Sequence, residues 1–127
     1  ILLVLPLVSL AGCTSESENW TRVDADEFAT AIDEEAGAFL LDTRTQDEWE
    51  ADGHLENATP IPHDKLSERS SELPDDKSTT ILLYCRSGNR SQAAAETLLD
   101  LGYTDVRDLE SGIIGWKDAG YSVIYGA

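Results

Sequence analysis

The sequence predicts an α/β fold built on a mostly parallel sheet of about five strands flanked by helices. Short apolar runs alternate along the chain with segments that have helical spacing. Two of the apolar runs lead directly into polar segments that contain arginine, as expected at the carboxyl ends of parallel strands. With 127 residues, 41% of them hydrophobic, the chain is long enough for one core and too short for two domains.

The beginning of the chain differs from the rest. Residues 1–12 are almost entirely apolar and end in small residues just before Cys13, a pattern that resembles a lipoprotein signal peptide with its lipobox. Since the chain has no methionine, we expect the start of this signal peptide to be missing. Ten apolar residues are too few to span a bilayer, which takes about 20, but an uncleaved anchor or a chance apolar tail stays open. We expect lipid on Cys13, a polar tether over residues 13–19, and the folded domain over 20–127.

The domain opens with a predicted strand at residues 21–23. Asp24 and Glu27 have the spacing of a capping box and predict a helix that Gly37 ends. One face of this helix carries Phe28, Ala31 and Ile32.

A buried strand is predicted over residues 38–41, and Asp42 and Arg44 follow it. Thr45 is then expected to cap a short helix through Glu48. Residues 59–62 contain two prolines and predict a piece of edge strand.

The second half is expected to alternate in the same way. A helix is predicted over residues 66–73, between Asp64 and Pro74. The remaining predicted elements are a buried strand at 81–84, a helix at 91–101 that stops at Gly102, and a last strand at 105–109.

Cys85 lies where the strand at 81–84 stops and the next helix begins. Backbone amides above a helix N-terminus and nearby guanidinium groups favour a thiolate over a thiol. A lone cysteine at a strand end can also be a small buried hydrophobe. The five polar or glycine residues that follow it favour a nucleophile instead.

The spacing from Cys85 to Arg90 separates two kinds of anion chemistry. Cysteine phosphatases use a Cys-x5-Arg loop around a phosphoryl group, whereas this chain has Cys-x4-Arg. One residue less removes up to about 3.5 Å of chain and one amide. The smaller ring suits one additional sulfur atom better than a phosphate, and the stretch resembles the active-site loop of the rhodanese (sulfurtransferase) family.

Other motifs resemble the same family, in the same order. They are Asp42-Thr43-Arg44, Glu48-Trp49, Gly53-His54-Leu55, and Gly112 to Trp116. The chain departs from the family where Glu56-Asn57-Ala58 replaces a Pro-Gly-Ala turn and Ser111 replaces a glycine. Asn57 is expected to adopt the left-handed conformation that glycine supplies.

The resemblance implies a three-layer fold and a catalytic persulfide on Cys85. The implied active-site loop consists of Arg86, Ser87, Gly88, Asn89, Arg90 and Ser91. Arg90 is expected to brace the loop and Arg86 to meet an anionic sulfur donor such as thiosulfate. Asp42 and Arg44 are expected to support the loop, and the acceptor is a thiol or a protein. A sulfur carrier or protein-binding module without turnover stays open as an alternative.

The net charge of −16 comes from 25 acidic and 9 basic residues. Such a charge argues against nucleic-acid binding and against attraction to anionic lipid, so a lipid anchor would be the only hold on a membrane. It also suggests adaptation to high salt, although plain solubility explains it too. No metal or other cofactor is expected, because Cys13, Cys85, His54 and His63 lack partners at ligand spacing. We expect a monomer anchored outside the cytoplasm.

Overall fold

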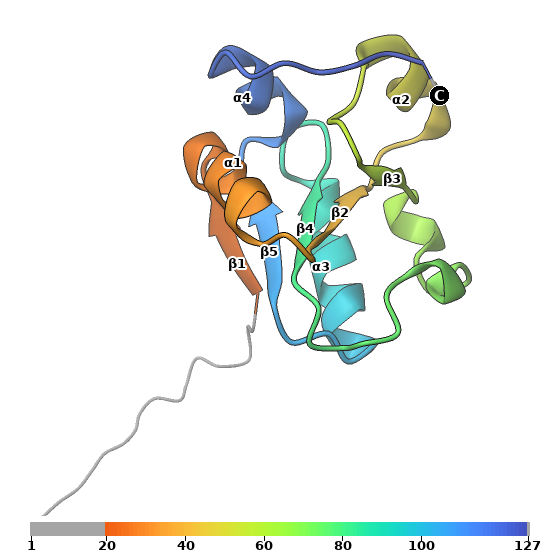
Figure 1. The fold of residues 1–127 in the computed structure, drawn as a ribbon. Helices are drawn as coiled ribbons and strands as arrows, with labels where there is room; N and C mark the ends of the chain where they lie inside the picture. The colour runs from red at the N-terminus through yellow and green to blue at the C-terminus, as the bar shows by residue number, and fades with distance from the viewer. Residues whose placement is uncertain (1–19, 127) are drawn as a thin grey trace, which may run out of the picture.

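The computed structural model of the protein describes residues 20–126. The expected signal peptide, Cys13 and the tether lie outside the described residues. Five parallel strands form one sheet in the order β1-β5-β4-β2-β3 (Figure 1). They are β1 (Trp20–Val23), β2 (Phe39–Asp42), β3 (Thr59–Pro60), β4 (Ile81–Tyr84) and β5 (Val106–Leu109). The predicted α/β class with its parallel sheet is confirmed.

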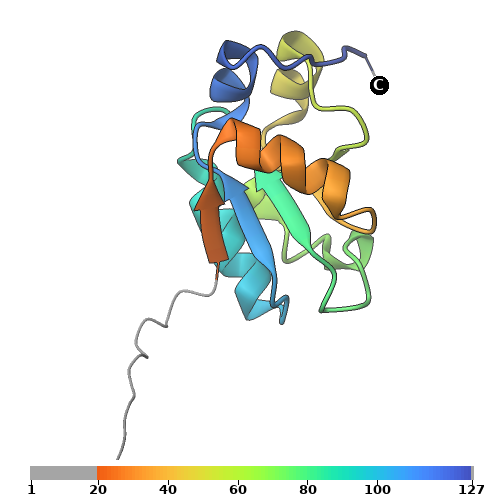
Figure 2. The ribbon, with the colours of Figure 1, turned by 60° about the vertical axis from the view of Figure 1, so that its left-hand side comes forward.

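Four α-helices flank the sheet and complete the three layers. They are α1 (Ala25–Glu34), α2 (Gln46–Asp52), α3 (Arg90–Asp100) and α4 (Gly112–Asp118). Helix α1 crosses one face of the sheet while α3 lies behind the other face (Figure 2). Helices α2 and α4 lie beyond the ends toward which the strands point (Figure 1).

Both faces of the sheet bury an apolar cluster. The cluster on the α3 side contains Leu41, Ile61, Leu66, Leu73, Ile81, Leu83, Ala94, Ala95, Leu98, Tyr103 and Val106. The cluster on the α1 and α4 side contains Ala25, Phe28, Ala31, Leu40, Leu55, Leu82, Tyr84, Leu109, Ile113 and Trp116. All four residues of β4 are buried because this strand lies in the middle of the sheet with helices on both sides.

Side-chain capping fixes the starts of α1 and α2, as predicted. Asp24 and Glu27 form a reciprocal capping box at the start of α1, and Thr45 and Glu48 form another at the start of α2. Asn57 has a φ of 70°, the left-handed conformation expected of it. Strand β3 lies at one edge of the sheet, as the two prolines of residues 59–62 indicated.

The helix predicted over residues 66–73 is wrong. The chain forms two short 3-10 turns instead, at His63–Lys65 and Ser70–Glu72, with Leu66 and Leu73 buried against the sheet. Serine side chains compete with the backbone for hydrogen bonds, and this segment holds three serines within five residues. Two apolar anchors seven residues apart do not require a regular helix between them.

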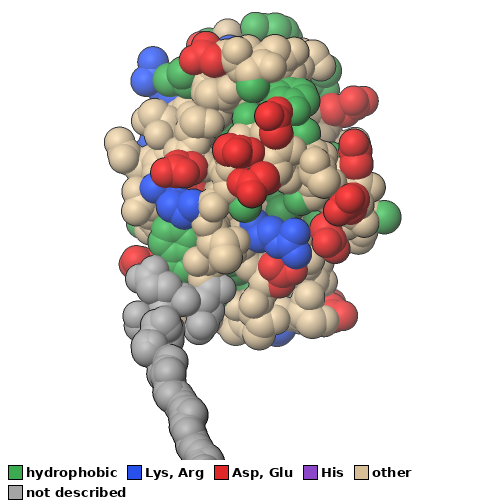
Figure 3. Space-filling model, turned by 90° about the vertical axis from the view of Figure 1, so that its left-hand side faces the viewer, with side chains coloured by type: hydrophobic (Ala, Val, Ile, Leu, Met, Phe, Trp, Pro, Cys, Tyr) green, Lys and Arg blue, Asp and Glu red, His purple; other side chains and the backbone are tan. Residues whose placement is uncertain are grey.

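Acidic groups outnumber basic ones over the visible side of β1 and α1 (Figure 3). Within residues 20–126, no helix is long and apolar enough to cross a membrane. Nor does any group of three or more acidic, histidine or cysteine side chains in that range come together as a metal site.

Candidate active site

The fold places Cys85 at the carboxyl end of β4, the strand between β2 and β5. The loop that carries it rises between α4 and α2 before α3 begins at Arg90 (Figure 1). The first amides of α4 bind this loop from above, because Ile113 donates to the Cys85 carbonyl (2.9 Å) and Ile114 to the Arg86 carbonyl (3.1 Å). Helix α4 therefore fixes the backbone of Cys85 and of the residue that follows it.

The Cys85 thiol lies inside the loop, only 1% exposed. The Gly88 amide donates a hydrogen bond to its Sγ at 3.1 Å. The thiol in turn faces the Ser91 hydroxyl, with 3.4 Å between Sγ and Oγ. The loop thus encloses the sulfur with one backbone donor and one hydroxyl group that can donate or accept.

Gly88 makes the tight turn possible. Its φ is 97°, and a Cβ added here would collide with the backbone oxygen of Glu110. Its carbonyl accepts from Arg22 Nη2 at 2.6 Å and from Gln92 Nε2 at 3.0 Å. The turn is therefore fixed from β1 on one side and from α3 on the other.

The two loop arginines differ in their surroundings. Arg90 makes a bidentate ion pair with Glu48, with both N–O distances at 2.7 Å. Hydrogen bonding from Arg90 lowers the pKa of Glu48 to about 2. Arg86 is exposed and has no ion pair with any residue in the described range. Arg90 thus connects the loop to α2, while the Arg86 guanidinium is available to an incoming anion.

The other loop residues divide into exposed and buried ones. Ser87 and Asn89 are exposed, whereas Gly88 and Ser91 are buried. The structure therefore brings all six predicted loop residues around or beside Cys85, and among the described residues Gly88 and Ser91 are the two that form hydrogen bonds with its sulfur.

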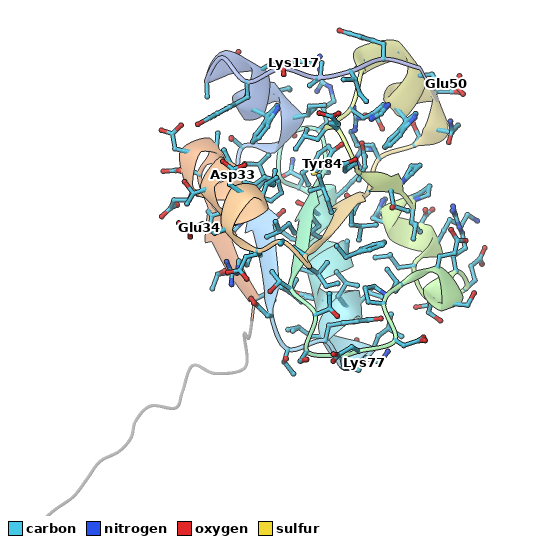
Figure 4. The ribbon with its side chains drawn as sticks, in the orientation of Figure 1. Asp33, Glu34, Glu50, Lys77, Tyr84 and Lys117 are labelled. Atoms are coloured by element: carbon cyan, nitrogen blue, oxygen red, sulfur yellow. The ribbon has the colours of Figure 1, made fainter. Side chains whose placement is uncertain are left out.

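Asp42 and Arg44 form a buried pair beneath the loop. Arg44 Nη2 lies 2.7 Å from Asp42 Oδ2, and both side chains are at most 1% exposed. Tyr84 donates its hydroxyl to the same carboxylate at 2.6 Å and accepts from the Leu55 amide at 3.1 Å. Tyr84, labelled in Figure 4, lies near the carboxyl end of β4. Burial, with the neighbouring Asp42 charge, raises the pKa of Tyr84. The network ties β2 to β4 directly below Cys85.

His54 is buried and contacts backbone. Its Nδ1 lies 3.1 Å from the Leu55 carbonyl and its Nε2 lies 3.2 Å from the Gly126 carbonyl. Its ring stacks on Trp49 with centroids 3.5 Å apart. The histidine holds the end of the domain against α2.

Three residues that support the loop were not predicted from the sequence to do so, namely Glu48, Arg22 and Asp108. Glu48 was expected only as a helix cap, although its place in the acidic-aromatic pair was a signal. Arg22 and Asp108 are cross-strand neighbours in β1 and β5, joined by a 3.0 Å ion pair. An acidic residue in the middle of a buried strand was the available signal for Asp108.

Taken together, the fold and loop define an α/β domain that presents a single cysteine at the carboxyl edge of a parallel sheet. The sequence matches the family model described as Rhodanese-like domain over residues 24–119. A protein named sulfurtransferase from Allochromatium vinosum is 32% identical over 103 residues, which cover 81% of this chain and 94% of that one.

Solved structures agree with this match. A rhodanese-related protein from Thermoplasma volcanium is 30% identical with a TM-score of 0.72, over 84% of this chain and 99% of that one. A thiosulfate sulfurtransferase from Pseudomonas aeruginosa is 30% identical with a TM-score of 0.74, over 84% of this chain. The match spans only 20% of that longer protein. The chain belongs to the rhodanese-like domain family.

Proposed function

We propose that the protein is a sulfurtransferase that carries a sulfane sulfur as a persulfide on Cys85 and takes it from an anionic donor such as thiosulfate. The observation that carries this proposal is the enclosed Cys85 sulfur with the Gly88 amide directed at it. The family and its relatives named sulfurtransferase support it.

In the first step the Cys85 thiolate attacks the outer sulfur of thiosulfate. A new S–S bond forms, the original S–S bond breaks, and sulfite leaves with the electron pair. Sulfite is a stable leaving group, so the step needs no general acid.

In the second step a nucleophilic acceptor attacks the outer persulfide sulfur. Cyanide would leave as thiocyanate and a thiolate as its own persulfide, while Cys85 returns to the thiolate. Each step exchanges one S–S or S–C bond for another, and the cycle consumes no external oxidant or reductant.

The loop supplies electrostatic stabilisation for the charged sulfur. Amides from Arg86 to Ser91 would hold the persulfide anion in the way an oxyanion hole holds a developing charge. Arg86 is suited to the sulfonate oxygens of the donor because it is exposed and has no ion pair among residues 20–126. Arg90 supports the loop through Glu48.

Thiocyanate formation from thiosulfate and cyanide tests this function. The wild-type protein should show turnover, and Cys85→Ser should abolish it while the circular dichroism spectrum and melting temperature stay close to the parent. Turnover by the serine variant would contradict the nucleophile. A wild-type protein that binds a partner but never acquires sulfur would favour the carrier or binding module.

We also propose that the domain acts outside the cytoplasm as a monomer held by lipid on Cys13. The lipobox-like residues before this cysteine support the proposal. Cys13→Ala, expressed from the complete gene, should move the protein from the membrane fraction to the soluble fraction. If the variant stays with the membrane, an uncleaved anchor is the better explanation.

A further inference from the structure

All three asparagines of the chain lie in the pattern Asn-x-Ser/Thr, the acceptor sequon for N-linked glycans in proteins that act outside the cytoplasm. The three sequons are Asn19-Trp20-Thr21, Asn57-Ala58-Thr59 and Asn89-Arg90-Ser91. Serine and threonine fill about one position in six, so chance would place all three asparagines in sequons in only about one chain in 200. Asn19 lies outside the described residues, which leaves two sequons whose surroundings can be compared.

The Asn57 sequon lies on the surface of the domain. Asn57 is exposed in the turn before β3, with a φ of 70°, and Ala58 and Thr59 are half-buried. Strand β3 is at the edge of the sheet and pairs with β2 on one side. The asparagine and the threonine that a glycan-transferring enzyme must contact are therefore both accessible, at least in part, on the folded domain.

The Asn89 sequon differs because its hydroxyl group is buried. Asn89 itself is exposed just before α3, but Ser91 is 0% exposed. The Ser91 Oγ lies 3.4 Å from Cys85 Sγ inside the loop. Arg90, the middle residue of the sequon, is held by its ion pair with Glu48. An enzyme that acts on the folded domain cannot reach this hydroxyl without opening the active-site loop.

Asn57 stands between two surface cavities on the side of the sheet that α1 covers. The cavities have volumes of about 280 Å³ and about 400 Å³, and Asn57, Glu56 and Ile32 line both of them. Ile32 is a half-buried apolar residue, and the exposed Glu56 carboxylate can accept hydrogen bonds from sugar hydroxyls. No residue from 85 to 91 lines either cavity. A sugar chain on Asn57 would therefore cover partly apolar surface outside the residues of the Cys85 loop.

We propose that Asn57 carries an N-linked glycan, attached to the folded domain outside the cytoplasm. The inference rests on the proposed location of the domain and not on its sulfur chemistry. The donor is a sugar chain activated as a phosphate ester. The Asn57 side-chain nitrogen forms a bond to the anomeric carbon, the bond from that carbon to the phosphate oxygen breaks, and the phosphate leaves with the electron pair. The nitrogen loses one proton to a base of the transferring enzyme, and nothing is oxidised or reduced.

Peptide mapping by mass spectrometry tests the proposal, because trypsin separates the three sequons. Cleavage after lysine and arginine places Asn57 in the peptide 45–65 and Asn89 in the peptide 87–90, while the peptide with Asn19 ends at Arg22. The protein should be expressed from the complete gene in its own host. Peptide 45–65 should carry added mass that releases sugar fragments on collision, and peptide 87–90 should be unmodified.

Two substitutions at Thr59 form a matched pair, because both leave Asn57 in its left-handed turn. Thr59→Ala removes the hydroxyl that the sequon requires and should abolish the added mass on peptide 45–65. Thr59→Ser keeps a hydroxyl at the same position and should retain it. Sulfur added to peptide 45–65 that persists in Thr59→Ala is excluded by its mass, whereas a sugar chain that persists there would overturn the proposal.

Asn57→Asp is a second variant for the case that Thr59→Ala does not fold. Aspartate also tolerates the left-handed conformation, and its side chain has no nitrogen to accept a sugar. The variant should lack the glycan and keep thiocyanate formation close to the wild-type rate, since Asn57 is not part of the Cys85 loop.

The outcomes separate this proposal from the others. An unmodified Asn57 in the wild-type protein would overturn it, in whichever cell fraction the protein is found. A glycan on Asn89 would also overturn it, because that would mean attachment before the loop folds. Unmodified protein outside the cytoplasm would reject the glycan alone, whereas unmodified protein in the cytoplasm would reject the proposed location as well. Sulfur transfer is measured independently of all these results.

Discussion

At the scale of single residues, the geometry of the site depends on Gly88. Its amide is a donor to the sulfur, its carbonyl is held by Arg22 and Gln92, and its backbone has a conformation that disfavours any side chain. One position thus combines a hydrogen bond to the sulfur with a close approach of the loop to Glu110, just after β5.

Gly88→Ala should therefore damage both stability and activity. A left-handed conformation costs a non-glycine residue about 1–2 kcal/mol, and the collision with Glu110 adds to it, so we expect a loss of about 2–4 kcal/mol. Sulfur transfer should fall by at least about tenfold, as the donor to the sulfur is displaced. Urea unfolding and thiocyanate formation measure the two effects.

Gly120→Ala is the matched control for that substitution. Gly120 also has a positive φ, 94°, but a Cβ there meets nothing within 4 Å. Its cost should stay near the backbone strain alone, about 1–2 kcal/mol, with activity retained. Equal effects of the two substitutions would show that the Gly88 loop tolerates a side chain.

At the scale of elements, the ion pair between Glu48 and Arg90 joins α2 to the start of α3. The pKa of Glu48 is lowered to about 2 from an ordinary value of 4.5, chiefly by hydrogen bonding from Arg90. A lowered pKa means that the carboxylate stabilises the fold fully above pH 4.5 and that this contribution is lost as the pH falls toward 2.

Glu48→Gln tests the ion pair with Arg90, because glutamine can keep the capping box of α2 while it removes the negative charge. We expect the variant to lose about 1–3 kcal/mol of unfolding free energy near pH 7, with the difference from wild type shrinking below about pH 4.5. Glu50→Gln, on the same helix but exposed, changes the net charge equally and should have little effect. A difference between Glu48→Gln and wild type that does not depend on pH would contradict the ion pair.

The elements also show what the sequence could and could not predict. The apolar runs at β2 and β4 and the capping boxes of α1 and α2 are local signals, so the starts of these four elements were predicted to within one residue, whereas α1 ends at Glu34 and not at Gly37. The helix prediction for residues 66–73 was wrong because irregular turns bury Leu66 and Leu73 against the sheet without a regular helix.

The candidate site was predictable where its residues are adjacent in the sequence. The loop from Cys85 to Ser91 follows directly from one strand and one helix. Arg22 and Asp108 were not found because their contact depends on the pairing of β1 with β5, 86 residues apart in the chain. No local spacing encodes that register.

At the scale of the whole molecule, the dominant feature is a net charge of −16. The acidic groups visible around β1 and α1 in Figure 3 repel one another and repel an anionic donor at long range. Near the loop, the positive charge of Arg86 and the start of α3 act against that field, whereas the charge of Arg90 is compensated by Glu48.

Salt should therefore improve both stability and donor capture. The Debye length shrinks from about 10 Å at 0.1 M to about 3 Å at 1 M, which screens distant carboxylates more than contacts inside the loop. We expect the melting temperature and kcat/KM for thiosulfate to rise with KCl at constant pH. If both stay flat or fall, the protein is not adapted to high salt. A rise in melting temperature alone would keep the stability argument and reject the effect on donor capture.

The central claim is that Cys85 carries the transferred sulfur, and intact mass spectrometry after incubation with thiosulfate tests it most directly. The wild-type domain should gain the mass of one sulfur atom, peptide mapping should place that sulfur on Cys85, and cyanide should remove it. The Cys85→Ser variant should gain nothing. A wild-type protein that stays unmodified, or a sulfur atom found on any other residue, would contradict the account.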